Sequence, residues 1–152
     1  HSQFYSQTGA SPGSGTATIN YTGINPERKS WVVWEVIGHD TSTPVSESNT
    51  GSANAANALS VTLASVAAGN LAVSSGGFGR ASAVAPGTNE TELVNGEASS
   101  GGSVEMRTQV QYGTDTTQNW TWTGTADTGV GVAVEWAQAA AGSPSTQIII
   151  ID

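Results

Sequence analysis

The chain has 152 residues, which is enough for one domain with a substantial core. With 12 acidic and 4 basic residues its net charge is -8, which argues against binding to nucleic acid or to an anionic membrane surface. No apolar run approaches the roughly 20 residues that a membrane-spanning helix needs, and the lack of cysteine excludes disulfides, thiolate metal sites and cysteine nucleophiles.

Short blocks of alternating apolar residues run along the whole chain, with Gly, Asn, Asp, Pro and Ser clusters between them. The 19 glycines, the 11% of charged residues and a Ser plus Thr content of one quarter leave few good helix formers. A period of two between turn residues is typical of antiparallel strands. We predict strands over residues 2–6, 16–22, 30–38, 59–64, 70–76, 91–95, 104–112, 119–124 and 130–137, and a last one over 147–152.

Residues 54–68 contain many alanines, which would also suit a helix. Within this segment, however, Leu59, Val61 and Leu63 alternate with small or polar residues. Because successive side chains of a strand point to opposite faces, this alternation favours a strand. No helix is therefore predicted anywhere in the chain.

The patterns of three predicted strands indicate how the layers are arranged. Residues 31–37 and 130–136 are apolar on both faces, which predicts central strands that are covered on both sides. Residues 104–112 place Arg107, Gln109 and Gln111 on the face opposite to Val110, so one face of this strand is expected to meet water. Two antiparallel sheets packed face to face, as a sandwich of jelly-roll or Greek-key type, satisfy both patterns, and a closed barrel is the next possibility.

The end of the chain has a different composition. Residues 139–145 are rich in Ala, Gly, Ser and Pro, as in a linker, whereas the strand that follows is too apolar to stay in water. That strand should pair with a sheet, either of its own chain or of a neighbour. We therefore divide the chain into a β-sandwich domain (1–138) and a linker with a terminal strand (139–152). The candidate intersubunit strands comprise Ser2, Gln3, Phe4, Tyr5, Ile148, Ile149, Ile150 and Ile151.

A set of short β-prone segments carries a family resemblance: residues 11–19, 31–37, 40–44, 59–63, 85–88, 91–93 and 131–135. Together these segments resemble a loosely defined group of β-sandwich domains that occur in tailed-phage particle proteins and in large bacterial surface or secreted proteins. The resemblance covers most of residues 1–138 and implies that the chain starts within the domain, so that its first strands come from a preceding segment or from another subunit. It implies no catalytic residue.

The candidates for acid–base chemistry are few. His1 and His39 are the only histidines, and we interpret His39 with Asp40 as a polar turn rather than part of a catalytic triad or zinc site. Glu35 and Glu135 both lie in predicted core strands, and two carboxylates about 5 to 9 Å apart could cleave a glycoside. The alternative, which we favour, is that each carboxylate faces solvent or contacts an arginine (Arg28, Arg80 or Arg107).

Two binding sites are also conceivable. Asp40, Glu97, Asp115 and Asp127 lie in turn-rich regions where Ca²⁺ could find oxygen ligands, although aspartates that hydrogen-bond their own turns explain them without a metal. Trp120 and Trp122 point to the same face of one predicted strand. They would form a glycan platform if that face is outward and part of the core if it is inward, and the core is favoured.

These observations predict a non-enzymatic structural protein without a cofactor, located on a virion or on a cell surface. The leading hypothesis is a capsid decoration or a fibre or tail domain, whose partners are copies of itself or other structural subunits. The alternatives are a repeat domain of a secreted adhesin or surface filament linked by strand donation, and a carbohydrate-binding module that recognises surface glycans. At least one terminus is expected to contact another chain.

Overall fold

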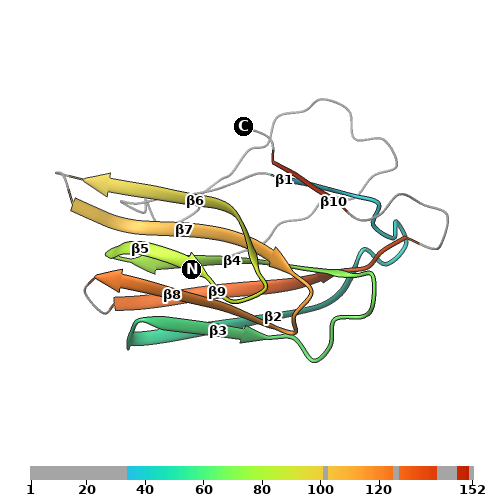
Figure 1. Cartoon of the computed structure of the whole chain (residues 1–152), viewed down its shortest axis with the longest axis horizontal. Coiled ribbons are helices and arrows are strands. Elements are labelled where there is room, and N and C mark those ends of the chain that lie inside the picture. Colours follow the sequence, from blue (N-terminus) through green and yellow to red (C-terminus); the bar gives the residue numbers. More distant parts are fainter. Residues whose placement is uncertain (1–33, 101–102, 125–126, 140–146, 151–152) are drawn as a thin grey trace, which may run out of the picture.

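The computed structural model describes residues 34–100, 103–124, 127–139 and 147–150 (Figure 1). These residues form two antiparallel sheets that pack against each other as a β-sandwich, and they contain no helix, so the predicted fold class is confirmed. The described strands are β1 (Trp34–Ile37), β2 (Val45–Ala56), β3 (Ala58–Thr62), β4 (Leu71–Gly79), β5 (Ala81–Pro86), β6 (Thr91–Ser100), β7 (Ser103–Gly113), β8 (Thr117–Gly124), β9 (Asp127–Trp136) and β10 (Gln147–Ile150).

The five-stranded sheet has the order β2-β9-β4-β7-β6, and the three-stranded sheet has the order β3-β8-β5. The chain passes from one sheet to the other at almost every connection between β2 and β9, and only the β6–β7 hairpin stays within one sheet. Some of these passages are very short. A single residue, Arg80, lies between β4 and β5 and adopts the left-handed conformation (φ 53°) that such a sharp turn requires.

The main core lies between the two sheets and is built around aromatic side chains. Trp120 is fully buried and Trp122 is 4% exposed. Both pack against Phe78, with ring centroids 6.0 and 5.0 Å apart. Aliphatic side chains from β3 and the loop after it, among them Leu59, Val61 and Leu63, complete this cluster. The two tryptophans therefore face inward, as the favoured interpretation predicted.

Glycines make room for these rings in the facing sheet. Gly51, Gly131 and Gly76 are direct neighbours on β2, β9 and β4, so they form one line across three strands. A Cβ atom on Gly131 would lie 3.0 Å from Leu59 and 3.2 Å from Trp120, and one on Gly76 would overlap the Phe78 ring. Because real Cβ contacts are rarely that short, Gly131 and Gly76 allow the Trp120 indole and the Phe78 ring to lie close to the sheet.

A second apolar cluster covers the other face of the five-stranded sheet. It contains Val73, Val110, Val132, Val134 and Trp136, together with Val36 from β1. Strand β9 lies inside its sheet and is buried on both faces, so the prediction of a central strand there is confirmed. The same prediction for residues 31–37 stays a prediction: residues 34–37 form β1, which pairs with β10 among the described strands, and Val36 belongs to this outer cluster.

Other differences from the predicted pattern lie in polar segments. Strands β2 and β5 were not predicted, since β2 is mostly exposed and rich in Ser and Asn, and β5 is short and rich in alanine. The polar face of β7 was expected to meet water, yet Gln109 and Gln111 are fully buried. Gln111 donates to the Asn119 carbonyl in the three-stranded sheet and Gln109 donates to Glu92 of β6, so this expectation is wrong at those positions.

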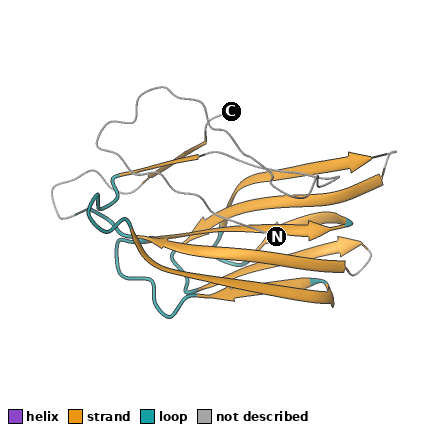
Figure 2. Cartoon of the chain, turned by 180° about the vertical axis from the view of Figure 1, so that it is seen from behind, coloured by secondary structure: helices purple, strands orange, loops and turns teal. Residues whose placement is uncertain are grey.

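Strand β10 forms a two-stranded ribbon with β1, beside one end of the sandwich (Figures 1 and 2). The terminal strand thus pairs with its own chain, which is one of the two outcomes that the sequence left open. The predicted strands over residues 2–6 and 16–22, with Ser2, Gln3, Phe4 and Tyr5, lie outside the described residues, as do His1 and Ile151.

Candidate functional site

The densest polar arrangement lies on the side of the sandwich where β6 and β7 face β5. Arg107, Gln109 and Gln111 alternate along β7 and point toward the three-stranded sheet. Gln109 Nε2 donates to Glu92 Oε2 at 2.6 Å, and Gln111 Nε2 donates to Glu90 Oε2 at 2.9 Å. We call this row of β7 side chains, with its glutamate partners, the polar seam.

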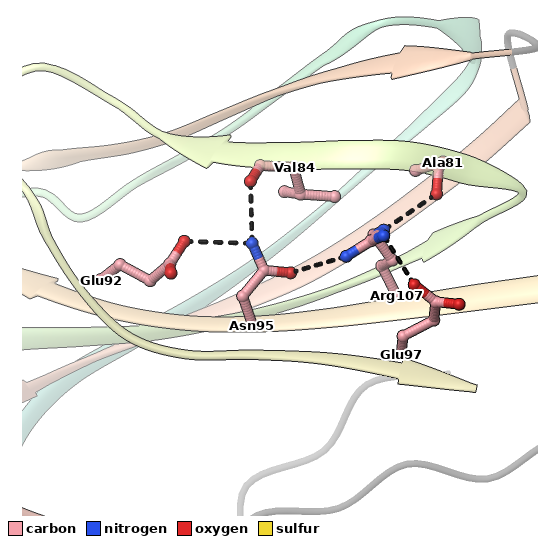
Figure 3. A network of polar contacts seen from close by, with 6 residues as sticks. All are labelled: Ala81, Val84, Glu92, Asn95, Glu97 and Arg107. Atoms are coloured by element: carbon pink, nitrogen blue, oxygen red, sulfur yellow. Dashed lines mark hydrogen bonds and ion pairs between the residues drawn. The ribbon is translucent and has the colours of Figure 1, made fainter. Parts of the chain in front are cut away.

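The polar seam, together with Asn95 of β6, also binds the backbone of β5, which is an edge strand of the three-stranded sheet. Arg107 Nε donates to the Ala81 carbonyl at 3.2 Å, and Asn95 Nδ2 donates to the Val84 carbonyl at 3.0 Å (Figure 3). Arg107 Nη2 also donates to Glu97 Oε2 at 2.6 Å, so this carboxylate balances its charge. Side chains of one sheet therefore satisfy edge carbonyls of the other, where no neighbouring strand is described.

Glu90 connects three parts of the fold at one end of the polar seam. Its Oε1 accepts from the Asn119 amide at 2.8 Å, and its Oε2 accepts from the Gly87 amide at 2.7 Å and from Gln111. Burial raises the pKa of the Glu90 carboxyl, and the two backbone hydrogen bonds partly oppose this rise. The side chain thus ties the turn before β6 to both β7 and β8.

Carboxylates also close the opposite side of the sandwich, where β2 runs beside β3. Glu47 accepts from the amides of Ala64 and Ser65, at 2.6 and 3.2 Å. Nearby, Asn49 Nδ2 donates to the Thr62 carbonyl at 2.7 Å. Both open sides of the sandwich are therefore closed by side chains that cross from the five-stranded sheet to the backbone of the other strand layer or its loops.

Glu135 is the most deeply buried acidic side chain in the described residues, at 2% exposure. Its Oε1 accepts from the Ala67 amide at 2.8 Å and from Asn70 Nδ2 at 2.6 Å. It lies directly opposite Glu47 in the β2–β9 ladder, and this pairing of like charges is offset because each carboxylate accepts from its own backbone amides in residues 64–67.

The backbones of Glu35 and Glu135 lie in different sheets. Glu35 lies in β1, where it is the register partner of Ile149, whereas Glu135 lies in β9 of the five-stranded sheet. The partners of Glu135 are a backbone amide and an asparagine, neither solvent nor an arginine. A general acid or base must reach its substrate, and this buried, hydrogen-bonded carboxylate is placed to anchor a loop.

His39 and Asp40 form the polar turn that the sequence predicted. His39 Nδ1 donates to the Val36 carbonyl at 2.8 Å, and its ring makes an edge contact with Trp136. Asp40 Oδ1 accepts from the Ser42 and Thr43 amides, and these hydrogen bonds lower the pKa of the Asp40 carboxyl. Asp40 thus acts on its own turn.

The other proposed calcium ligands have separate partners. Asp115 accepts from Asn89 Nδ2 at 3.1 Å, and Glu97 pairs with Arg107, while the side chain of Asp127 lies outside the described set. No group of three or more metal-ligating side chains occurs among the described residues. The prediction that Trp120 and Trp122 could form a glycan platform is wrong, because both rings are enclosed between the sheets and cannot stack on a sugar.

Sequence reasoning missed Glu47, Glu90 and the polar seam. One signal was available: Arg107, Gln109 and Gln111 follow a strand in which Asn95 and Glu97 occupy alternate positions. Hydrogen-bonding partners at alternating positions of two successive strands can indicate a buried polar row as well as a solvated face.

Comparisons with protein-family models, with curated proteins and with solved structures give no significant match. In the part of the chain that the structure describes, there is no helix with the length and apolar character needed to cross a membrane.

Proposed function

We propose that this domain is a non-enzymatic structural part of an extracellular assembly, and that the assembly is a virus particle in which it serves as a capsid decoration or a fibre or tail domain. One observation carries the non-enzymatic, structural part of the proposal. Each of the seven Asp and Glu side chains that the structure describes accepts a hydrogen bond from the chain itself.

These carboxylates hold turns, loops and strand edges. Glu47 and Glu135 bind the amides of residues 64–67, Glu90 joins β8 to the turn before β6, and Glu97 holds Arg107 against β5. Acidic groups used in this way stabilise the fold. The domain would then act through the shape of its outer surface and not through a reactive group. The virion assignment itself rests on the resemblance of the segments named above to phage particle proteins.

A repeat domain of a secreted adhesin or surface filament is the second candidate. It is favoured by the position of β10, which belongs to neither sheet of the sandwich and pairs only with β1 among the described strands. A terminal strand of this kind is what strand donation between successive subunits uses.

Immunogold electron microscopy on material from the source organism tests the proposal. Antibodies raised against the folded recombinant domain should label purified particles at regular positions, and mass spectrometry of those particles should find the chain in stoichiometric amounts. Antibody that has been absorbed with the domain serves as the control. Regular labelling along cell-surface filaments instead would select the second candidate.

A soluble intracellular distribution, with no particle or surface label, would contradict both candidates.

The enzymatic alternative has its own test, in which Glu35→Gln and Glu135→Gln are assayed against a panel of glycosides. We expect no hydrolysis by the unmodified domain. Hydrolysis that either substitution abolishes would replace the structural role with a catalytic one.

A further inference from the structure

The ladder between β1 and β10 is preceded by two further backbone contacts between the same two chain segments. Gln138 and His39 form an isolated antiparallel β-bridge, and the Ala139 amide donates to the Gly38 carbonyl at 3.0 Å. The next residue of the first strand, Ile37, is paired with Gln147. The chain therefore leaves the ladder after Ala139 and rejoins it at the neighbouring rung, with residues 140–146 between the two points.

This register has a consequence for the role of residues 140–146. Because Gly38 and Ile37 are consecutive, a strand without these seven residues could continue the ladder directly from Ala139. Residues 140–146 are therefore not needed to connect β9 to β10 on the same chain. Seven residues of Ala, Gly, Ser, Pro and Thr can extend over about 25 Å, which is enough for β10 to reach a neighbouring molecule.

The strand that receives β10 is held in place by contacts that do not involve it. Val36 is part of the apolar cluster on the five-stranded sheet, and its carbonyl accepts from His39 Nδ1. The Asp40 amide donates to the Ala137 carbonyl at 2.8 Å, which fixes the start of the ladder. Strand β1 therefore keeps an edge ready for pairing when β10 departs.

We propose that β10 is an exchangeable strand that leaves β1 of its own chain and pairs with β1 of a second copy, giving a reciprocal dimer. Exchange preserves the four residue pairs of the β1–β10 ladder, so it costs little in contacts. The three isoleucines of β10 disfavour the free strand in water. This inference rests on the proposed function and deepens it, since it names the partner as another copy of this chain.

Disulfide trapping tests the exchange directly, because the chain contains no cysteine of its own. Glu35 and Ile149 are register partners, and paired residues of antiparallel strands lie at a separation that a disulfide can bridge. In the double variant Glu35→Cys with Ile149→Cys, oxidation in concentrated solution at high salt should give a covalent dimer on a non-reducing gel. High salt screens the repulsion between two copies that each carry a charge of -8.

A matched pair inside the sandwich provides the control. Ser60 and Asn119 are register partners in β3 and β8, and their side chains are hydrogen-bonded at 2.7 Å. Ser60→Cys with Asn119→Cys should oxidise within one chain and remain monomeric, and each single-cysteine variant should give no covalent dimer. If the Glu35→Cys and Ile149→Cys variant oxidises only to monomer at every protein concentration, the exchange is overturned.

Removal of residues 140–146 separates exchange from other modes of association. The shortened chain keeps the ladder in register and loses the reach of β10, so light scattering should find a monomer where the full chain is dimeric. A dimer that persists after this deletion would place the contact on another surface and overturn the proposal. Either negative result leaves the particle-labelling experiment unaffected, so failure of the exchange and failure of the proposed function are distinguishable.

Discussion

At the scale of single residues, the sandwich depends on where side chains are absent as much as on where they are present. Gly76 faces the aromatic core, whereas its neighbour Gly77 faces the other side of the same strand. A Cβ atom added at Gly77 would make only an ordinary contact with Val130, at 3.8 Å. The two positions therefore form a matched pair for testing the close approach of the core rings.

We predict that Gly76→Ala lowers the free energy of unfolding by about 1–3 kcal/mol, because the new methyl group overlaps the Phe78 ring and the core must shift. Gly77→Ala should leave the stability unchanged or raise it slightly, since alanine restricts the unfolded chain. Urea unfolding followed by tryptophan fluorescence measures both. Equal changes in the free energy of unfolding at the two positions would show that the Phe78 ring does not limit the size of the residue at position 76.

Glu90 gives a prediction with a defined pH dependence. Burial raises the pKa of its carboxyl, so the folded state binds this proton more tightly than the unfolded state. Ionisation of Glu90 then lowers stability as the pH rises from the unfolded pKa to the folded one. The stability contributed by the neutral form is fully present below that window and is lost above it.

We therefore expect the unmodified protein to gain stability relative to Glu90→Gln as the pH falls from about 7 to about 4, where a free glutamate titrates. Denaturant unfolding of both proteins across this range gives the difference. A relative gain on going to higher pH would mean that the hydrogen bonds from Asn119 and Gly87 outweigh burial.

At the scale of elements, β5 is the strand whose position depends most on side chains of the other sheet. It pairs with β8 on one side, and Asn95 and Arg107 donate to its carbonyls on the other. Removing a donor leaves its buried acceptor unsatisfied, and this destabilises the fold by more than the hydrogen bond itself contributed. The edge of β5 should therefore respond to changes in the polar seam before the rest of the sheet does.

We predict that Arg107→Ala lowers the free energy of unfolding by about 1–3 kcal/mol and speeds amide hydrogen exchange in β5 more than in β3, the other edge of the same sheet. Glu97→Gln should have a smaller effect, because its side chain is 37% exposed and an amide oxygen can still accept from Arg107. Exchange rates that rise equally in β3 and β5 would mean that Arg107 supports the whole fold and not this edge.

The sequence predicted elements well where burial gives a clear alternation, and poorly where hydrogen bonds replace it. Strand β9 was recognised because both of its faces are apolar. Strand β2 lacks that signal, since its side chains are small and mostly exposed and Glu47 acts on a loop 17 residues away. The polar face of β7 was misinterpreted for a related reason: Gln109 and Gln111 are buried against partners that no single-strand pattern reveals.

At the scale of the whole molecule, the candidate sites could be foreseen only in part. The inward direction of Trp120 and Trp122 follows from the need to bury large aromatic surface, and the turn at Asp40 follows from local hydrogen bonding. The role of Glu135 depends on Ala67 and Asn70, more than 60 residues away in the sequence. Contacts of that kind arise from the topology, which alternating patterns do not specify.

The arrangement of the carboxylates also predicts how the molecule responds to metal ions. Asp40, Asp115 and Glu97 each have a protein partner, and they lie on different turns and strands. We expect no change in the thermal midpoint on addition of EDTA or of Ca²⁺ up to about 10 mM, which is above the weak affinities typical of extracellular modules. Differential scanning fluorimetry checks this, and a rise of several degrees with Ca²⁺ would reveal a site built in part from residues outside the described ranges.

The row of Gly51, Gly131 and Gly76 links positions that are far apart in the sequence, and Gly131 lies beneath Trp120. A side chain at position 131 would need space that the Trp120 indole and Leu59 fill, and one at position 76 would need space that the Phe78 ring fills. These positions are therefore not free to vary independently. Related sequences should show covariation: a side chain at position 131 accompanied by a smaller residue at position 120, and one at position 76 accompanied by a smaller residue at position 78.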